Sequence, residues 1–290
     1  TRVAGTLDAS APNGGHGGII ETSAAHVKIA DSANITTKSA QGLNGHWLID
    51  PFDFTIAASG GDITGAALGA LLGSNSVTLS TSTGTNSPTN RFATATGNGD
   101  IFVNDTVNWS ANTLTLNAER NININAVMTA DGTAKLSLIH GTSNGGSVNT
   151  GLGPNGFYGR VDFIGPGNEL KINNQIYTLI KDLAGLEAIN SSITTLQGYY
   201  ALAKDIDLES KLYARSVIGE IRKFATNADT LKGYFEGSFD GLGHVVKNLK
   251  ISGTAREDSD DQFGFFGAAF GAKIRNVGIA SGKVEVLGIL

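Results

Sequence analysis

The sequence predicts an all-β fold, a parallel β-helix (β-solenoid) with short helical excursions. Three observations lead to this prediction: a composition poor in charge and rich in glycine, short apolar runs that alternate with polar residues, and the recurrence of those runs at intervals of about 20 to 22 residues.

Composition favours short strands joined by tight turns. Of 290 residues, 39 are glycine and 5 proline, and only 16% are charged, against about 25% in an average globular chain. Serine, threonine, asparagine, alanine and glycine fill the space between Val, Ile and Leu.

The apolar runs have the period of two that is typical of strands. In Leu114-Thr115-Leu116, for example, the two leucines share one face and the threonine occupies the other. We expect these residues to point inward over at least residues 1–180: Leu7, Val27, Ile29, Leu79, Ile101, Leu114, Leu116, Ile122, Leu136 and Leu138.

The runs recur at a nearly constant interval, which one coil of a solenoid requires. The matched pairs are Leu7 with Val27, Leu79 with Ile101, and Leu114 with Leu136. Residues 66–72 and 183–189 instead have apolar residues at helical spacing, which predicts short helices. Residues 208–231 are richer in charge and predict a loop or helical excursion, and composition shifts near Tyr177.

Charge and cysteine content exclude several classes of function. The net charge is −5 and no lysine lies between Lys38 and Lys135, so no basic stripe exists for nucleic acid. No cysteine is present, which excludes disulfides and thiolate metal sites. No apolar run is long enough to span a bilayer, and Thr1 opens no signal-peptide pattern, so a targeting region would lie outside this chain.

Several phrases in the first 180 residues resemble the filamentous-haemagglutinin-like exoproteins of two-partner secretion systems. They occur together and in the family's order: Gly5 to Ser10, Gly17 to Ser23, Trp47 to Pro51, Leu114 to Ala118, Asn121 to Asn125, and Val161 to Phe163.

The remainder resembles the segment of such exoproteins that leads into GLUG-type repeats. Tyr199 to Asp207 precedes a first unit from Phe235 to Leu249, and a second unit follows in Phe263 to Gly267 and Ile274 to Val277. We therefore expect haemagglutinin-type coils over 1–180, a transition segment over 181–232, and GLUG-like coils over 233–290.

The resemblance implies a right-handed β-helix and a function without catalysis. It implies a structural or adhesive shaft of a large secreted bacterial surface protein that mediates adhesion, aggregation or biofilm formation. Export through an outer-membrane two-partner secretion transporter would use a region outside this chain. The host-cell, matrix or glycan ligand is left open.

Carboxylates are the candidates for the alternative, a carbohydrate-active β-helix enzyme acting on polysaccharide. Two carboxyl groups about 5 to 9.5 Å apart perform acid and base catalysis on glycosidic bonds. Asp50 and Asp53 form one candidate pair, and Asp205 and Asp207, beside Lys204, form another on one strand face. Asp205 also lies in a structural phrase of the family, so we assign no catalytic residue.

Metal and cofactor binding have weaker candidates. The stretch Glu257, Asp258, Ser259, Asp260 and Asp261 would offer oxygen ligands to calcium, but it matches no calcium motif and is better explained as a solvated loop tip. Histidines occur at 16, 26, 46, 140 and 244. A spacing of 20 residues would stack His26 on His46 and offer a transition-metal or haem site, although a solvent-facing pair is the simpler reading. We assign no metal or cofactor.

Residues at the expected corners and ends complete the prediction. Asn248 and Asn276 are expected to stack side-chain amides between coils, and Gly241 and Gly243 to take positive φ around Leu242. The phenylalanines at 235, 239, 265 and 266 are expected to fill the core rather than bind sugar. Because both chain ends read as strands without polar caps, we expect a fragment of a longer protein that is capable of end-to-end self-association.

Overall fold

The computed structural model describes residues 1–84, 96–142, 145–208, 211–222, 231–255 and 261–288. The fold is mostly β, with 45% of residues in strands and 7% in helices. The chain divides into two compact units, Thr1–Ile176 (unit 1) and Tyr177–Leu290 (unit 2).

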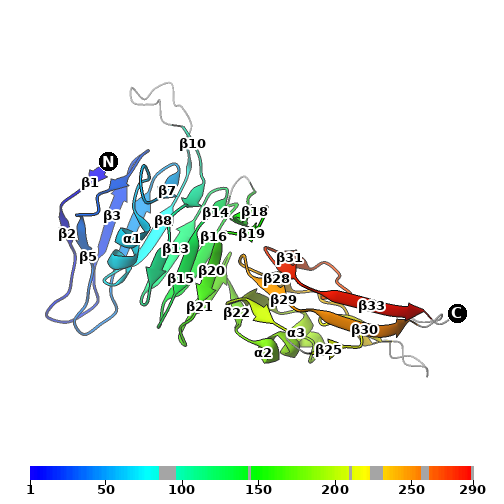
Figure 1. The fold of residues 1–290 in the computed structure, drawn as a ribbon. Coiled ribbons are helices and arrows are strands. Elements are labelled where there is room, and N and C mark those ends of the chain that lie inside the picture. Colours follow the sequence, from blue (N-terminus) through cyan, green and yellow to red (C-terminus); the bar gives the residue numbers. More distant parts are fainter. Residues whose placement is uncertain (85–95, 143–144, 209–210, 223–230, 256–260, 289–290) are drawn as a thin grey trace. The chain divides into compact units, whose positions relative to one another are not determined.

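Unit 1 is built around three sheets of parallel strands (Figure 1). The first contains, as successive neighbours, β3 (Ile19–Ser23), β6 (His46–Asp50), β8 (Ser76–Ser80), β13 (Thr113–Asn117), β16 (Lys135–Ile139) and β21 (Glu169–Ile172). The second contains β7 (Phe54–Ile56), β11 (Ile101–Val103), β14 (Ile122–Ile124) and β17 (Val148–Thr150), and the third β12 (Val107–Trp109), β15 (Val127–Ala130) and β20 (Arg160–Phe163).

Smaller pairs complete unit 1. The parallel ones are β1 (Arg2–Val3) with β4 (Lys28–Ile29) and β2 (Thr6–Asp8) with β5 (Asn34–Thr36). The antiparallel ones are β9 (Thr83–Gly84) with β10 (Gly97–Asn98) and β18 (Leu152–Gly153) with β19 (Gly156–Phe157).

Unit 2 repeats the parallel arrangement. Its first sheet contains β22 (Gln175–Ile180), β23 (Tyr199–Leu202), β28 (Ser238–Asp240) and β31 (Lys273–Arg275). The others contain β24 (Ile206–Asp207), β29 (Val245–Lys247) and β32 (Gly278–Ala280), and β25 (Leu212–Tyr213), β30 (Lys250–Ala255) and β33 (Lys283–Gly288). The pair β26 (Glu220–Arg222) and β27 (Leu231–Gly233) is antiparallel.

The chain visits the sheets of each unit in a fixed order. In unit 1, β11, β12 and β13 enter three different sheets, and β14, β15 and β16 then pair with them one by one in parallel. In unit 2, β28, β29 and β30 pair in the same way with β31, β32 and β33. Three strands therefore form one layer, and the next three form a layer in register with it.

Short helices interrupt the strands at both positions predicted from apolar spacing. Helix α1 (Gly65–Leu72) is capped by the Thr64 hydroxyl and buries Leu68 and Leu72, and α2 (Leu183–Ala188) is capped by Asp182. Helix α3 (Ile193–Leu196) was not predicted, although Ser192 and Thr195 form a capping box that marks its start.

The core consists of the inward residues of these strands. Nine of the ten predicted inward positions are buried, from Val27 to Leu138. Leu7 is only half-buried. Its strand, β2, pairs with β5 alone, so Leu7 is covered from one side. Of the four predicted core phenylalanines, those at 235, 239 and 265 are buried, and the partly buried Phe266 packs against them, with 5.0 Å between the ring centroids of Phe265 and Phe266.

The predicted interval of 20 to 22 residues is right at some layers and wrong at others. Leu114 pairs with Leu136 as predicted, and Ile101 pairs with Ile122. Leu7, however, pairs with Ile35 rather than Val27, and Leu79 pairs with Leu116 rather than Ile101. The connections differ in length, and α1 in particular is inserted between β7 and β8, so the offset between paired strands is not constant.

The three predicted segments, 1–180, 181–232 and 233–290, remain a prediction. Residues 208–231, predicted as a loop or helical excursion, lie partly outside the described residues. Their described part contains the strands β25 and β26.

Candidate functional site

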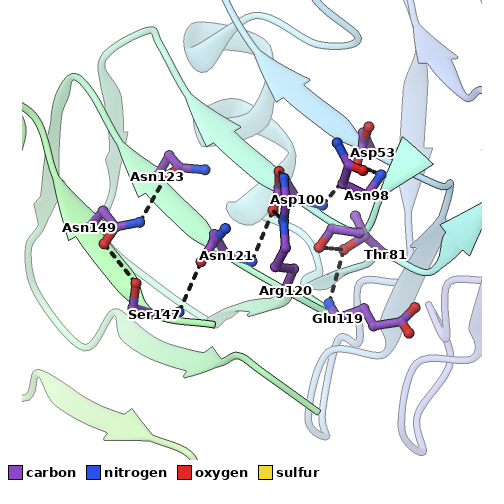
Figure 2. Close-up of polar contacts among 11 residues, drawn as sticks. Asp53, Thr81, Asn98, Asp100, Glu119, Arg120, Asn121, Asn123, Ser147 and Asn149 are labelled. Atoms are coloured by element: carbon purple, nitrogen blue, oxygen red, sulfur yellow. Dashed lines mark hydrogen bonds and ion pairs between the residues drawn. The ribbon is translucent and has the colours of Figure 1, made fainter. Parts of the chain in front are cut away.

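Polar side chains form a column at one corner of unit 1, which Figure 2 shows. Asp53, Asp100, Asn121 and Ser147 each come directly before a strand of the second sheet, β7, β11, β14 and β17 respectively. The Asp53 carboxylate accepts from the Asp100 N–H at 2.8 Å. The Asp100 carboxylate accepts from the Asn121 N–H, and the side-chain amide oxygen of Asn121 accepts from the Ser147 N–H, both at 3.1 Å.

This corner column joins each layer to the next at the residue just before the backbone hydrogen bonds of the sheet begin. The ladder continues immediately after it, since the Ile101 N–H donates to the Asn121 carbonyl at 2.9 Å. Backbone N–H groups need an acceptor when they leave water, and short Asp and Asn side chains supply one at turns. The sequence signal is the interval of 21 residues between Asp100 and Asn121, which sequence reasoning did not use.

Asp100 is the most enclosed carboxylate of the column. Its side chain is only 5% exposed and is paired with Arg120, whose Nε donates at 2.8 Å. The hydrogen bond from Arg120 holds the pKa of Asp100 below its ordinary value, against the opposing effect of burial, and the Asn121 N–H adds to the lowering. Asp100 therefore stays ionised and serves as an acceptor rather than a proton donor.

Hydroxyl and amide groups surround the corner column (Figure 2). The Thr81 hydroxyl donates to the Gly99 carbonyl at 2.9 Å and accepts from the Glu119 N–H at 3.3 Å. The Asn149 amide donates to the Asn123 carbonyl oxygen at 3.0 Å, so a side-chain amide ladder joins β14 and β17. These contacts run between layers and stabilise their register.

The predicted pair of Asp205 and Asp207 lies at the matching corner of unit 2. The Asp205 carboxylate accepts from the Val245 N–H at 3.1 Å and pairs with Lys247 at 2.7 Å. Burial raises the pKa of Asp205, but the bonds from Lys247 and Val245 outweigh it and leave the pKa below its ordinary value. Asp207 accepts from the Asn248 amide at 2.8 Å. Both carboxylates are thus bound to the adjacent strand, β29, or the residue after it.

The two carboxylates of the other predicted pair, Asp50 and Asp53, lie in different surroundings. Asp53 belongs to the corner column, whereas Asp50 ends β6. Burial raises the pKa of Asp50, and the negative charge of Glu21 raises it further. Asp62 is a residue that sequence reasoning missed: burial raises its pKa, although its carboxylate accepts from the Thr55 N–H at 2.8 Å.

The acidic stretch proposed for calcium lies largely outside the described residues, which include neither Glu257 nor Asp258, Ser259 and Asp260. Asp261 is described, and its buried carboxylate forms an ion pair with Arg215. Among the described residues, no group of three or more His, Asp or Glu side chains is placed to hold a metal ion.

The histidines at 26 and 46 do not form the stack that their spacing left open. His46 pairs with Ile19 across the strands, and His26 is exposed. The offset between these layers is 27 residues rather than 20, because the connecting loops are longer. The His16 ring accepts from the Leu43 N–H at 3.0 Å, the His140 ring lies 3.0 Å from the Gly146 carbonyl, and the buried His244 ring lies 3.3 Å from Asp205.

The predicted asparagine ladder is also corrected. Asn248 is opposite Ser281 and not Asn276, and the Ser281 hydroxyl donates to the Asn248 side chain at 3.2 Å. Asn276 instead donates to the buried Asp240 at 3.0 Å. Of the corner glycines, Gly243 has φ of 86° and Leu242 itself φ of 50°. Gly241 does not have the predicted positive φ but is required for space, since an added Cβ would lie 2.3 Å from the Asn276 carbonyl.

The chain matches no protein-family model, no curated protein and no solved structure. None of the helices in the described parts of the chain has the length and apolar character needed to cross a membrane.

Proposed function

We propose that the chain is a section of a right-handed parallel β-solenoid and serves as a structural and adhesive shaft in a large secreted bacterial surface protein. The observation that carries the proposal is the fixed order in which successive strands enter three parallel sheets, layer after layer, in both units. A repeated layer is the unit from which solenoids build length.

The corner contacts support a structural role for the acids. A carboxylate that accepts a backbone N–H from the next layer, as Asp53, Asp100 and Asp205 do, contributes to register. A glycosidase requires one carboxyl group that is protonated and one that is free to attack or activate water. The lowered pKa values of Asp100 and Asp205 do not favour the first of these roles.

The cellular setting follows from the sequence resemblance to filamentous-haemagglutinin-like exoproteins. On this proposal the parent protein leaves the cell through an outer-membrane two-partner secretion transporter, remains at the outer surface, and promotes adhesion, aggregation or biofilm formation.

Two measurements test the shaft. Small-angle scattering of the purified chain should give a maximum dimension well above that of a compact protein of 290 residues, and beads coated with the chain should adhere to epithelial cells or matrix more than beads coated with albumin. A compact particle, or adhesion no greater than that of albumin, would contradict the proposal.

The alternative, a carbohydrate-active enzyme, rests on Asp205 with its neighbours Lys247 and His244. Release of reducing ends or unsaturated products from a polysaccharide panel, abolished by Asp205→Asn, would favour it over the shaft.

A further inference from the structure

One outward row of side chains in unit 2 has an exposed aromatic ring and an exposed cation on either side of a buried serine. Tyr199, Ser238 and Lys273 are aligned across β23, β28 and β31, one residue from each strand. Their inward neighbours Tyr200, Phe239 and Ile274 form the adjacent row, and Tyr200 and Phe239 are buried in the core. Because successive residues of a strand face opposite ways, the row of Tyr199, Ser238 and Lys273 lies on the outer face.

Tyr199 presents a supported ring at this face. Its side chain is 40% exposed, and its ring packs edge to face against Tyr177 with 5.6 Å between centroids. Tyr177 is itself buried, so the ring of Tyr199 is held from one side and accessible from another. An exposed, immobilised aromatic ring is a surface on which the apolar face of a sugar ring stacks at little entropic cost.

Lys273 gives the row an available positive charge. Lys273 is exposed, and within the described part of the chain it has no ion-pair partner. The other cation nearby, Arg275, donates its Nε to the buried Asp240 at 2.7 Å, so that pair is neutral overall. Glu236, two residues before Ser238, is hydrogen-bonded to Gln197 at 2.8 Å. Lys273 is therefore the group of this face most suited to bind an anion.

The spacing of the row sets the size of the ligand. Strands of a sheet lie about 4.8 Å apart, so Tyr199 and Lys273, two strands apart, are separated by about 10 Å at the backbone. This is roughly the length of a disaccharide, which would place one sugar on Tyr199 and the carboxylate of the next near Lys273.

From this row we infer that unit 2 binds an oligosaccharide containing uronic acid, with Tyr199 as the stacking platform and Lys273 as the carboxylate contact. The inference extends the proposed adhesive role and rests on it, because it names the class of ligand for which the shaft would be a carrier.

The test compares an oligogalacturonate with its methyl ester, which has the same rings without the negative charge. Titration calorimetry with the full chain should show binding of the acid form at low salt and binding at least about tenfold weaker for the ester, since hydrogen bonds to charged groups exceed neutral ones by this margin. Raising the salt to 0.5 M should weaken the binding of the acid form, because an exposed charge is screened.

Variants locate the site. Tyr199→Ala and Lys273→Gln should each weaken binding by about fivefold or more, and Tyr199→Phe should retain it. Glu236→Gln should strengthen binding, because it removes a neighbouring negative charge. The matched controls are Tyr158→Ala, another exposed tyrosine, and Lys250→Gln, another exposed lysine. Neither control should change the affinity.

Three results would overturn the inference: equal affinity for acid and ester, equal losses in the control variants, or no binding to galacturonate, glucuronate and mannuronate oligomers. If the coated beads still adhere to cells in that last case, the proposed function stands and only this ligand is wrong. If uronates bind but the beads do not adhere, the proposed adhesive function fails instead.

Discussion

The two units build the same kind of layer from different core residues. In unit 1, inward positions are mainly aliphatic, as in the aligned leucines of β13 and β16. In unit 2, Phe235, Phe239, Phe265 and Phe266 contact one another, with centroids 5.0 to 6.1 Å apart for the four contacts among them. Stacked aliphatic residues repeat from layer to layer, whereas an aromatic cluster depends on each ring to fill a specific space.

The corners differ in a related way. Unit 1 repeats one contact, a side-chain oxygen on the next backbone N–H, three times in succession. In unit 2 the equivalent contact of Asp205 is accompanied by an ion pair to Lys247 and a contact with the His244 ring, as Arg120 accompanies Asp100 in unit 1, and Asp240 is bound by Arg275. The comparison teaches that a parallel layer needs its corner N–H groups satisfied, and that the acceptor can belong to a column of repeated polar residues or to a single carboxylate, with an ion pair beside it in either unit.

The largest loss of stability is expected from a charge placed among the aligned, buried aliphatic residues of unit 1. Leu116→Asp places a carboxylate at a fully buried position and should destabilise unit 1 by about 4 kcal/mol or more, because the charge has no partner there. Thr115→Asp, on the outer face of the same strand, should cost less than about 1 kcal/mol. Hydrogen exchange with mass spectrometry, read separately for each unit, measures both. Similar losses for the two variants would mean that β13 is not oriented as described.

The aromatic cluster should respond nearly as strongly, but in unit 2. Phe239→Ala removes a buried ring that contacts Phe265 and Phe266 and should destabilise unit 2 by about 3 to 5 kcal/mol. Phe239→Leu should recover part of the loss, since it leaves a smaller cavity. Exchange protection in unit 1 serves as the internal control. An equal loss of protection in both units would show that they unfold as one.

The sequence predicted strands and their inward faces better than their partners. Alternation alone identified Leu114, Leu116, Leu136 and Leu138 as buried, because the period of two depends only on the local chain. Partners depend on the number of residues between strands, and a single insertion such as α1 changes that number without changing the alternation. For this reason Leu7 was matched to Val27 rather than Ile35.

The candidate acids were found, but their roles were not. Asp205 directly precedes β24 and Asp207 ends it, and both are exposed on either side of the buried Ile206. Their hydrogen-bond partners, Val245 and Asn248, are about 40 residues away in sequence, and no local pattern contains that information. The same limit explains why Asp100, whose partners Arg120 and Asn121 are about 20 residues away, was not singled out.

A smaller effect is expected at the corners, where the two units again differ. Asp100→Asn should destabilise unit 1 by about 2 kcal/mol at pH 7, because it removes a charged acceptor that is only 5% exposed and is hydrogen-bonded to Arg120. Asp205→Asn should cost less than about 1 kcal/mol, since that carboxylate is 41% exposed and its ion pairs are screened by solvent.

Lowering the pH should remove the difference in stability between each of these two variants and the wild type. The folded pKa of each carboxylate is lowered, so its stabilisation is complete above the unfolded pKa of about 3.9. It is lost as pH falls through the folded value. Urea unfolding followed from pH 7 to pH 2.5 should show each variant and the wild type converging below about pH 4. A difference that persists at pH 2.5 would assign the effect to shape rather than charge.

The smallest effect has the opposite sign and distinguishes acids within unit 1. Burial and the charge of Glu21 raise the folded pKa of Asp50, so the ionised form is penalised in the fold and the penalty appears as pH rises above about 3.9. Asp50→Asn keeps the shape and removes the charge. It should therefore leave stability unchanged at pH 3 and increase it at pH 7 by about 0.5 kcal/mol or less, since Asp50 is partly exposed and solvent screens the repulsion.

Glu21→Gln should give a gain in the same direction, and the double variant should gain less than the sum, because either substitution already removes the shared repulsion. Additive gains, or a loss at pH 7, would show that Asp50 and Glu21 do not interact and that Asp50 contributes to the layer as Asp100 does.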